Sequence, residues 1–168
     1  AKLSKKDGML HLAYGGGWYY DDVATSDSFF KLYEPLLKNN CHLHVYTEAD
    51  ENRKKRMKDF EKKYPNFHYE GYMDRKKLLD EYKKYDFGLN FYGFLDNEKN
   101  KSIFVKTAFS NKNFDYAAAM LPILTNREAK SKSDFAVNNG IGYSYNLHDY
   151  ADPLIYKEIG DKNKYKKL

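Results

Sequence analysis

The feature that most constrains the fold of this chain is a repeated alternation between short apolar runs and longer amphipathic segments. Residues 9–14 (MLHLAY) form an apolar run that stops at three glycines, and residues 42–46 (HLHVY) form a second run. Each run is followed by a segment whose apolar residues recur at helical spacing. Strands that alternate with helices in this way form parallel sheets with right-handed crossovers. We therefore predict an α/β fold of three layers, Rossmann-like and doubly wound, with a mainly parallel sheet of about six strands and helices on both faces.

The alternation of apolar runs and amphipathic segments continues along the rest of the chain, with one interruption. Residues 92–108 form a long polar stretch that lacks periodicity, and loops of this length in compact domains are often functional. We expect one domain over residues 1–168, with a core at about 9–150 and a C-terminal tail at about 153–168 that is helical at most. The further expected strands are residues 66–72, 86–91, 121–125 and 142–145, and the expected helices begin near residues 26, 50, 74 and 110.

Cysteine content and hydropathy narrow the class of protein. Cys41 is the only cysteine, so an intrachain disulfide and a cysteine-rich zinc site are both excluded. No apolar run approaches the roughly 18 residues that a membrane span needs, and the first residues lack the apolar core of a signal peptide. We expect a cytoplasmic protein.

The formal net charge of +5 comes from lysine-dense stretches in which Asp and Glu are interspersed. Solvated helix faces are the simplest interpretation of this pattern. The alternative is attraction of an anionic partner, either a phosphorylated ligand or an anionic lipid surface, with nucleic acid the weakest candidate. We expect no nucleic-acid partner.

Candidate binding residues lie where the predicted strands end. In a parallel sheet ligands bind beyond the carboxyl ends of the strands, which are Gly15–Gly17, Gly71–Met73, the loop after Phe91 and the turn after Thr125. Glycines at the first of these places let backbone approach a pyrophosphate and leave N–H groups free to donate. The triplet does not match the G-x-G-x-x-G dinucleotide fingerprint, and no P-loop motif occurs in the chain. A purely structural turn is the alternative.

A more specific pattern is residues 110–124, SNKNFDYAAAMLPIL. This segment resembles the "P-x-K-x-x-E-Y-x-A-x-G-x-P-V-I" segment in the C-terminal domain of retaining glycosyltransferases of the two-Rossmann-domain (GT-B) fold. Four residues match at their spacing and an aspartate takes the acidic position: Lys112, Tyr116, Ala118, Pro122 and Asp115.

The resemblance implies roles for individual residues. In the family this segment forms a helix whose N-terminus, here Ser110, Asn111 and Lys112, faces the donor diphosphate, and the acidic residue accepts hydrogen bonds from the ribose. A helix N-terminus and a lysine both favour an anion, which gives Lys112 a catalytic role in stabilising the leaving diphosphate. Lys112 and Asp115 are three residues apart and share one helix face. The alternative is a solvated ion pair between these two side chains.

A looser resemblance to the same domain covers about residues 9–145. It includes the glycine turn Gly15, Gly16 and Gly17, and residues 66–72, which resemble the "N-V-x-F-x-G" strand of the family. It implies that backbone at Tyr72 and Met73 holds the base and that the loop after Tyr92 covers the sugar. The donor would be a UDP- or GDP-sugar, with no cofactor and no required metal.

The resemblance also implies a hexosyl transfer to an acceptor in glycan, lipid or polysaccharide biosynthesis. The acceptor-binding N-terminal domain is expected to be absent from this chain, since the lysine-rich lead-in resembles a cut at an interdomain linker. We therefore expect donor binding with little turnover, and for the full enzyme we consider peripheral association with the inner membrane surface.

Three departures from the family pattern keep two other functions open. Thr107 stands at the place of an upstream carboxylate, Met120 at that of a glycine and Ser110 at that of a proline. One alternative is a non-catalytic α/β module with a degenerate site. The other is a protein-interaction domain of flavodoxin-like topology, which predicts an exposed tyrosine patch in place of a cleft.

The histidines offer a metal site as a further possibility. The spacing His42-x-His44 puts two imidazoles on one face of a strand. No carboxylate or cysteine cluster accompanies them at matching spacing, so we expect no metal site. We predict satisfied or exposed side chains for all five histidines: His11, His42, His44, His68 and His148.

Overall fold

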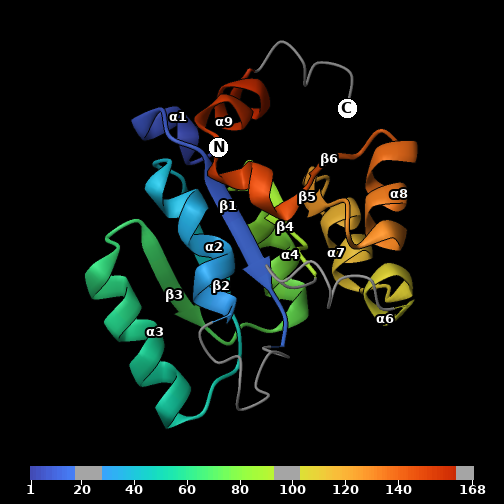
Figure 1. Cartoon of the computed structure of the whole chain (residues 1–168). Coiled ribbons are helices and arrows are strands. Elements are labelled where there is room, and N and C mark those ends of the chain that lie inside the picture. Colours follow the sequence, from blue (N-terminus) through green and yellow to red (C-terminus); the bar gives the residue numbers. More distant parts are fainter. Residues whose placement is uncertain (18–27, 93–102, 162–168) are drawn as a thin grey trace.

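The computed structural model describes residues 1–17, 28–92 and 103–161 and has a six-stranded parallel sheet at its centre (Figure 1). The strand order is β3-β2-β1-β4-β5-β6, and each neighbouring pair is parallel. The predicted fold class is therefore confirmed. The strands are β1 (His11–Gly15), β2 (His42–Tyr46), β3 (Phe67–Gly71), β4 (Phe87–Leu89), β5 (Ile123–Asn126) and β6 (Gly142–Tyr145).

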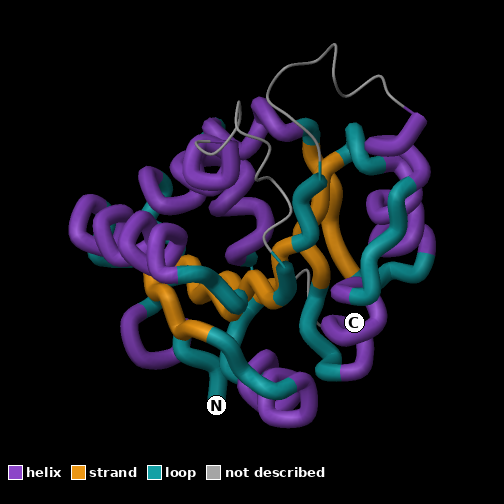
Figure 2. Tube along the Cα trace, turned by 90° about the horizontal axis from the view of Figure 1, so that it is seen from below, coloured by secondary structure: helices purple, strands orange, loops and turns teal. Residues whose placement is uncertain are grey.

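Helices cover both faces of the sheet (Figure 2). One face packs against α2, α3, α9 and η1 in a core that includes Leu12, Leu43 and Phe67. The other face packs against α4, α7 and α8 in a core that includes Ala13, Tyr116 and Ile123. The helices are α1 (Ser4–Asp7), α2 (Ser28–Lys38), α3 (Glu51–Lys63), α4 (Arg75–Tyr82), α6 (Ile103–Thr107), α7 (Lys112–Ala118), α8 (Lys130–Asn138), the 3-10 helix η1 (Leu147–Ala151) and α9 (Pro153–Gly160).

The apolar runs form strands because the central strands are buried on both faces. All five residues of β1 are buried, so an uninterrupted apolar run suits this position better than alternation does. The expected helix caps form as well. The side chain of Asp50 accepts a hydrogen bond from the Arg53 N–H at 2.8 Å, and Asp74 accepts one from the Lys76 N–H at 2.9 Å.

Three elements differ from the sequence-based expectation. Helix α8 was not expected, and α6 forms inside the stretch interpreted as a loop. The first part of the tail predicted at about 153–168 is helical, as expected at most, but the core does not end at about 150, since α9 inserts Ile155, Tyr156 and Ile159 into it. Helices α6 and α8 have only five and nine residues, so they give a weak periodic signal in the sequence.

The strand order places a crevice at the carboxyl ends of β1 and β4. The chain winds outward from β1 to β3 and then returns to β4 on the other side of β1, so the crossovers after β1 and β4 diverge. This divergence is the topological switch point at which open α/β sheets bind ligands. Figure 1 shows the arrows of β1 and β3 pointing to this same edge of the sheet.

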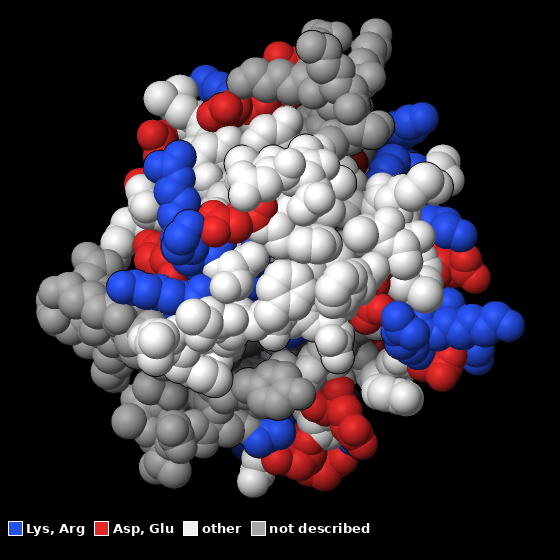
Figure 3. All heavy atoms as spheres, turned by 90° about the vertical axis from the view of Figure 1, so that its right-hand side faces the viewer, with Lys and Arg blue, Asp and Glu red and all other residues white. Residues whose placement is uncertain are grey.

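The surface carries charges of both signs. Figure 3 views the side of α6, α7 and α8, where Lys and Arg lie beside Asp and Glu around a broad uncharged area. This arrangement agrees with solvated helix faces. The exposed apolar side chains on these three helices are Ile103, Phe104, Phe114 and Val137. Within the described residues, no helix has the length and apolar character needed to cross a membrane.

Candidate functional site

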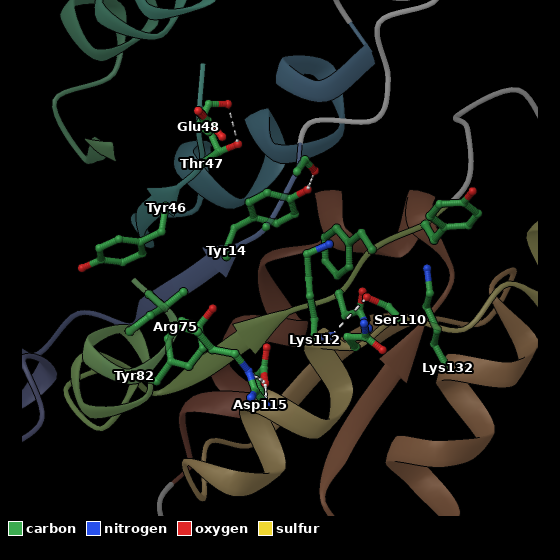
Figure 4. Close-up of a pocket in the computed structure, with 18 of the residues that line it drawn as sticks. Tyr14, Tyr46, Thr47, Glu48, Arg75, Tyr82, Ser110, Lys112, Asp115 and Lys132 are labelled. Carbon is green, nitrogen blue, oxygen red and sulfur yellow. Dashed lines mark hydrogen bonds and ion pairs between the residues drawn. The ribbon is translucent and has the colours of Figure 1, made fainter. Parts of the chain in front are cut away.

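A cleft of about 940 Å³ opens at the carboxyl ends of the strands (Figure 4). It is bounded by the ends of β1, β2 and β4, the start of α4, the segment before α7, and α8. Every residue predicted to bind the donor lines this cleft. These residues are Gly15, Gly16, Gly17, Tyr72, Met73, Ser110, Asn111, Lys112 and Asp115.

Glycine is required at Gly15, the last residue of β1, and at Gly16, because other side chains pack directly against their backbone. A Cβ at Gly15 would lie 1.8 Å from the hydroxyl oxygen of Tyr82, and a Cβ at Gly16 would lie 2.7 Å from Cε of Lys112. Gly16 also has φ of +130°, which L side chains rarely adopt. The turn therefore lets Lys112 pass directly against the backbone.

The N–H groups of Gly15 and Gly16 are not free donors, contrary to the sequence-based expectation. The Gly16 N–H donates to the Tyr46 carbonyl at 3.0 Å, and the Gly15 N–H donates to the Tyr116 hydroxyl at 3.3 Å. Parallel pairing of β1 with β2 uses the first group, and the buried tyrosine uses the second. Gly15 and Gly16 thus shape the cleft by leaving space and do not present N–H groups to it.

Tyr116 fixes α7 to the sheet and so positions the helix side chains in the cleft. It is fully buried, and its hydroxyl lies 3.0 Å from the carbonyl oxygen of Leu89 as well as close to Gly15. Its ring packs where a Cβ at Gly88 would lie 2.5 Å away. The tyrosine of the matched segment therefore links α7 to β1 and β4 together.

Two lysines enter the cleft from neighbouring helices, Lys112 from α7 and Lys132 from α8, and point the same way in Figure 4. Lys132 is only 2% exposed. Nζ of Lys112 lies 4.9 Å from the centroid of the Tyr14 ring, and Nζ of Lys132 lies 3.5 Å from that of Tyr92. Within the described part of the chain, neither ammonium has a carboxylate within ion-pair distance.

Loss of water makes both ammonium groups costly, Lys132 because it is buried and Lys112 because it is partly buried in the cleft. Loss of hydration lowers the pKa of Lys112 to about 8. Loss of hydration and then the nearby charge of Lys112 lower the pKa of Lys132 to about 7. Unpaired buried cations are destabilised unless an anion binds beside them. The cleft is therefore built to receive negative charge.

Asp115 makes an ion pair that the sequence did not suggest. Nε and Nη2 of Arg75 lie 2.8 and 2.6 Å from Oδ1 of Asp115, so the expected alternative, a pair with Lys112, does not form. Both contacts use the same oxygen. Oδ2 makes no hydrogen bond to the described residues and is available to a ligand.

The opposite wall of the cleft comes from β2 and from the loop after β3. Tyr46, Thr47 and Glu48 lie at the end of β2, while Tyr72 and Met73 follow β3. The Tyr72 side chain is 72% exposed, so it stands at the mouth of the cleft. Of the loop predicted to cover the sugar, residues 93–102 lie outside the described part, and Phe104 and Phe109 line the cleft.

Sequence reasoning missed Lys132 and Arg75. Lys132 lies in a lysine- and serine-rich stretch that showed no helical period, and nothing local distinguishes it from the exposed Lys130 nearby. Arg75 directly follows the recognised helix cap Asp74, but its partner lies forty positions further along the chain.

Comparison with known proteins adds a family and a fold. The family model described as "Glucosyltransferase 3-like, C-terminal domain" matches residues 25–159, which is most of the chain. No protein of curated function matches the sequence.

Two solved structures share the fold. WaaG, a glycosyltransferase involved in lipopolysaccharide biosynthesis, is 13% identical with a TM-score of 0.60, and the match covers 96% of this chain and 42% of that one. Trehalose-6-phosphate synthase OtsA is 10% identical with a TM-score of 0.55, covering 98% of this chain and 38% of that one. This chain therefore spans well under half the length of either structure.

Proposed function

We propose that this chain, which belongs to the glucosyltransferase 3-like C-terminal domain family, binds the nucleotide-sugar donor of a glycosyltransferase in the cleft at the carboxyl ends of its strands. Family membership agrees with the likeness of residues 110–124 to the C-terminal domain of GT-B glycosyltransferases. The single observation that carries the proposal is the pair of lysines, Lys112 and Lys132, that enter this cleft without carboxylate partners among the described residues.

The two lysines suit a diphosphate better than a carboxylate or a neutral sugar. A diphosphate diester carries two negative charges on adjacent groups, and two ammonium groups on adjacent helices can each contact one of them. The low local dielectric strengthens both contacts. As the bond to the sugar breaks, charge builds on the leaving diphosphate, and Lys112 and Lys132 stabilise that charge without reorganising.

The remaining parts of the donor follow from the walls of the cleft. Oδ2 of Asp115 is available to accept a hydrogen bond from a ribose hydroxyl while Arg75 holds Oδ1 in place. Tyr72 and Met73 line the cleft after β3, and in this proposal the backbone there holds the base. Ser110 and Asn111, which precede α7, line the cleft and would contact the phosphates and the sugar.

We propose a retaining hexosyl transfer from a UDP- or GDP-sugar, in a cytoplasmic enzyme whose other half binds the acceptor. Exposed aromatic side chains at the cleft, Tyr72, Phe104 and Phe109, are 72%, 65% and 45% exposed and suit contact with that other half. The isolated chain would then bind donor with little turnover. No metal is needed in this scheme, because the lysines supply the positive charge, so EDTA should leave donor affinity unchanged.

Isothermal titration calorimetry with UDP-, GDP-, ADP- and CMP-sugars tests the proposal. We expect one class of nucleotide to bind at a single site and Lys112→Met to weaken it strongly. Lys130→Met is the matched control, since Lys130 is exposed on α8 and pairs with Asp134 at 2.7 Å. If the folded chain binds no nucleotide-sugar at millimolar concentration, the proposal fails and a non-catalytic α/β module becomes the better account.

A further inference from the structure

A second polar cluster lies at the opposite end of the sheet from the cleft. Its members are four of the five histidines of the chain, on the amino-terminal halves of β1, β2 and β3. His11 is the register partner of His42, and His44 is that of His68. The ring centroids are 4.4 Å apart in each of these two pairs. We call this group the histidine cluster.

Two of the histidines, His11 and His44, form a row of hydrogen-bond contacts with a carboxylate at each end, Asp7 at one and Glu70 at the other. Oδ2 of Asp7 lies 2.9 Å from Nε2 of His11, Nδ1 of His11 lies 3.0 Å from Nε2 of His44, and Nδ1 of His44 lies 2.8 Å from Oε1 of Glu70. The row therefore runs from α1 across β1 and β2 to β3 through three contacts at hydrogen-bond distance.

Counting hydrogen-bond donors shows that the row lacks one. A neutral imidazole carries a single N–H, so His11 and His44 supply two donors for three contacts, and an ionised carboxylate supplies none. If Glu70 accepts from His44 and His44 accepts from His11, then Nε2 of His11 turns a lone pair toward the oxygen of Asp7. If the row points the other way, the mismatch moves to Glu70. If both histidines donate outward, the mismatch falls on the contact between Nδ1 of His11 and Nε2 of His44. One of the three contacts therefore needs an added proton or another positive centre.

A third nitrogen marks the Asp7 end as the place for that centre. Nε2 of His42 lies 3.9 Å from Oδ2 of Asp7, is buried, and makes no hydrogen bond with any residue that the structure describes. The ligand atoms of Asp7, His11 and His42 all lie within 4.8 Å of one another. The Met9 N–H donates to Oδ1 of Asp7 at 2.9 Å, which turns Oδ2 toward the imidazoles.

We propose that Asp7, His11 and His42 bind a divalent transition-metal ion of the zinc class through Oδ2 and two Nε2 atoms. Two imidazoles and one carboxylate are a common zinc ligand set and leave a fourth position for water. Ligands around tetrahedral zinc lie about 3.3 Å apart, so binding moves Nε2 of His42 closer to Oδ2 of Asp7 than its present 3.9 Å and moves Nε2 of His11 slightly away from its present 2.9 Å. The rings of His11 and His42, which stack within 4° of parallel, must tilt so that both Nε2 lone pairs face the ion. This site revises the sequence-based expectation that no metal binds.

The neighbouring residues supply the support that metal-bound histidines need. With a metal on Nε2, His11 donates its Nδ1 proton to His44, and His44 donates to Glu70. His42 has its Nδ1 atom 2.8 Å from Nε2 of His68. Such outer partners fix the tautomer of a ligating histidine. Because Asp7 ends α1 while His11 and His42 begin β1 and β2, the metal clamps the N-terminal segment to the sheet.

Spectroscopic titration of the 168-residue chain with Co²⁺, prepared without a histidine tag, tests the site. We expect a visible absorption band that saturates at one Co²⁺ per chain and is lost when Zn²⁺ is added. At a hundredfold excess over its Kd, Zn²⁺ should raise Tm by about 8 °C. Asp7→Asn should abolish the band, and Glu70→Gln should weaken Zn²⁺ binding by about tenfold.

His148→Gln is the matched control, because His148 is exposed on η1 and lies outside the histidine cluster. It should bind both metals like the unchanged chain. Circular dichroism would establish that Asp7→Asn is folded, which its exposed position favours. A Co²⁺ titration with no band, or an equal band in folded Asp7→Asn, would overturn the proposal and leave an extra proton as the centre that completes the row.

Discussion

The two ends of the sheet present opposite electrostatic problems. At the carboxyl ends, Lys112 and Lys132 enter a cleft without carboxylate partners in the described part of the chain. The two ammonium groups therefore lack anionic partners. At the amino ends, Asp7 and Glu70 flank imidazoles that carry too few protons, so the histidine cluster lacks a donor. In a protein interior whose other polar groups are mostly paired, such imbalances indicate where a ligand completes the structure.

The largest effect should come from removing the buried cation of α8. Lys132→Met keeps the length and apolar stem of the side chain but takes away its charge, so we expect nucleotide-sugar affinity to fall about a hundredfold. Calorimetry measures the loss. Co²⁺ binding at the histidine cluster should be unaffected, and Asp7→Asn should show the reverse pattern. A variant that impaired both sites would contradict their independence.

The pH dependence of donor binding should be the next largest effect. In the free cleft the pKa values of Lys112 and Lys132 are about 8 and about 7, and binding of a diphosphate requires both ammonium forms. The diphosphate diester of a nucleotide-sugar does not change charge between pH 6 and 9. Its affinity should therefore fall by at least about tenfold over this interval, as the free lysines lose their protons. Titrations at several pH values check this, and Lys132→Met should flatten the slope.

The same substitution should stabilise the fold while it harms binding. The pKa of Lys132 is lower in the folded chain than in the unfolded chain, so the unfolded state binds more protons between about pH 7 and 10 and stability rises with pH across this window. Below pH 7 Lys132 is charged in the folded chain as well, so the full free-energy cost of burying its charge lowers the stability. Lys132→Met should raise the free energy of unfolding at pH 6 by on the order of 2 kcal/mol, and by less at pH 10. Urea unfolding measures both values, with Lys130→Met as the control.

The smallest effect concerns a backbone position away from both sites. Met120 occupies the place of a family glycine and has φ of +51°, with its side chain 83% exposed. A non-glycine residue in the left-handed region costs about 1 kcal/mol, and an exposed methionine loses little packing on removal. Met120→Gly should therefore raise the free energy of unfolding by about 1 kcal/mol in a urea titration and leave both ligands bound as before. A loss of stability would show that the left-handed turn carries no strain.

Much of the cleft was predictable because its residues follow strand ends in a local pattern. Residues 110–124 indicated Lys112 and Asp115, and the glycine turn indicated Gly15–Gly17. The roles of the two glycine N–H groups were not predictable, since they depend on Tyr46 and Tyr116 from other elements. Helix α8 gave no periodic signal, so its lysine was missed.

The sequence by itself determined the alternation of strands and helices, the parallel sheet and the edge at which the cleft opens. These follow from local periodicity and from the handedness of the chain. Only the tertiary structure decided which lysines lose their water and which histidines meet. Lys132 has the same sequence surroundings as Lys130, but only Lys132 is buried. His11 lies far from His42 along the chain, but the pairing of β1 with β2 brings the two side chains together. Hydration and charge pairing depend on neighbours from distant segments, and folding alone brings those neighbours together.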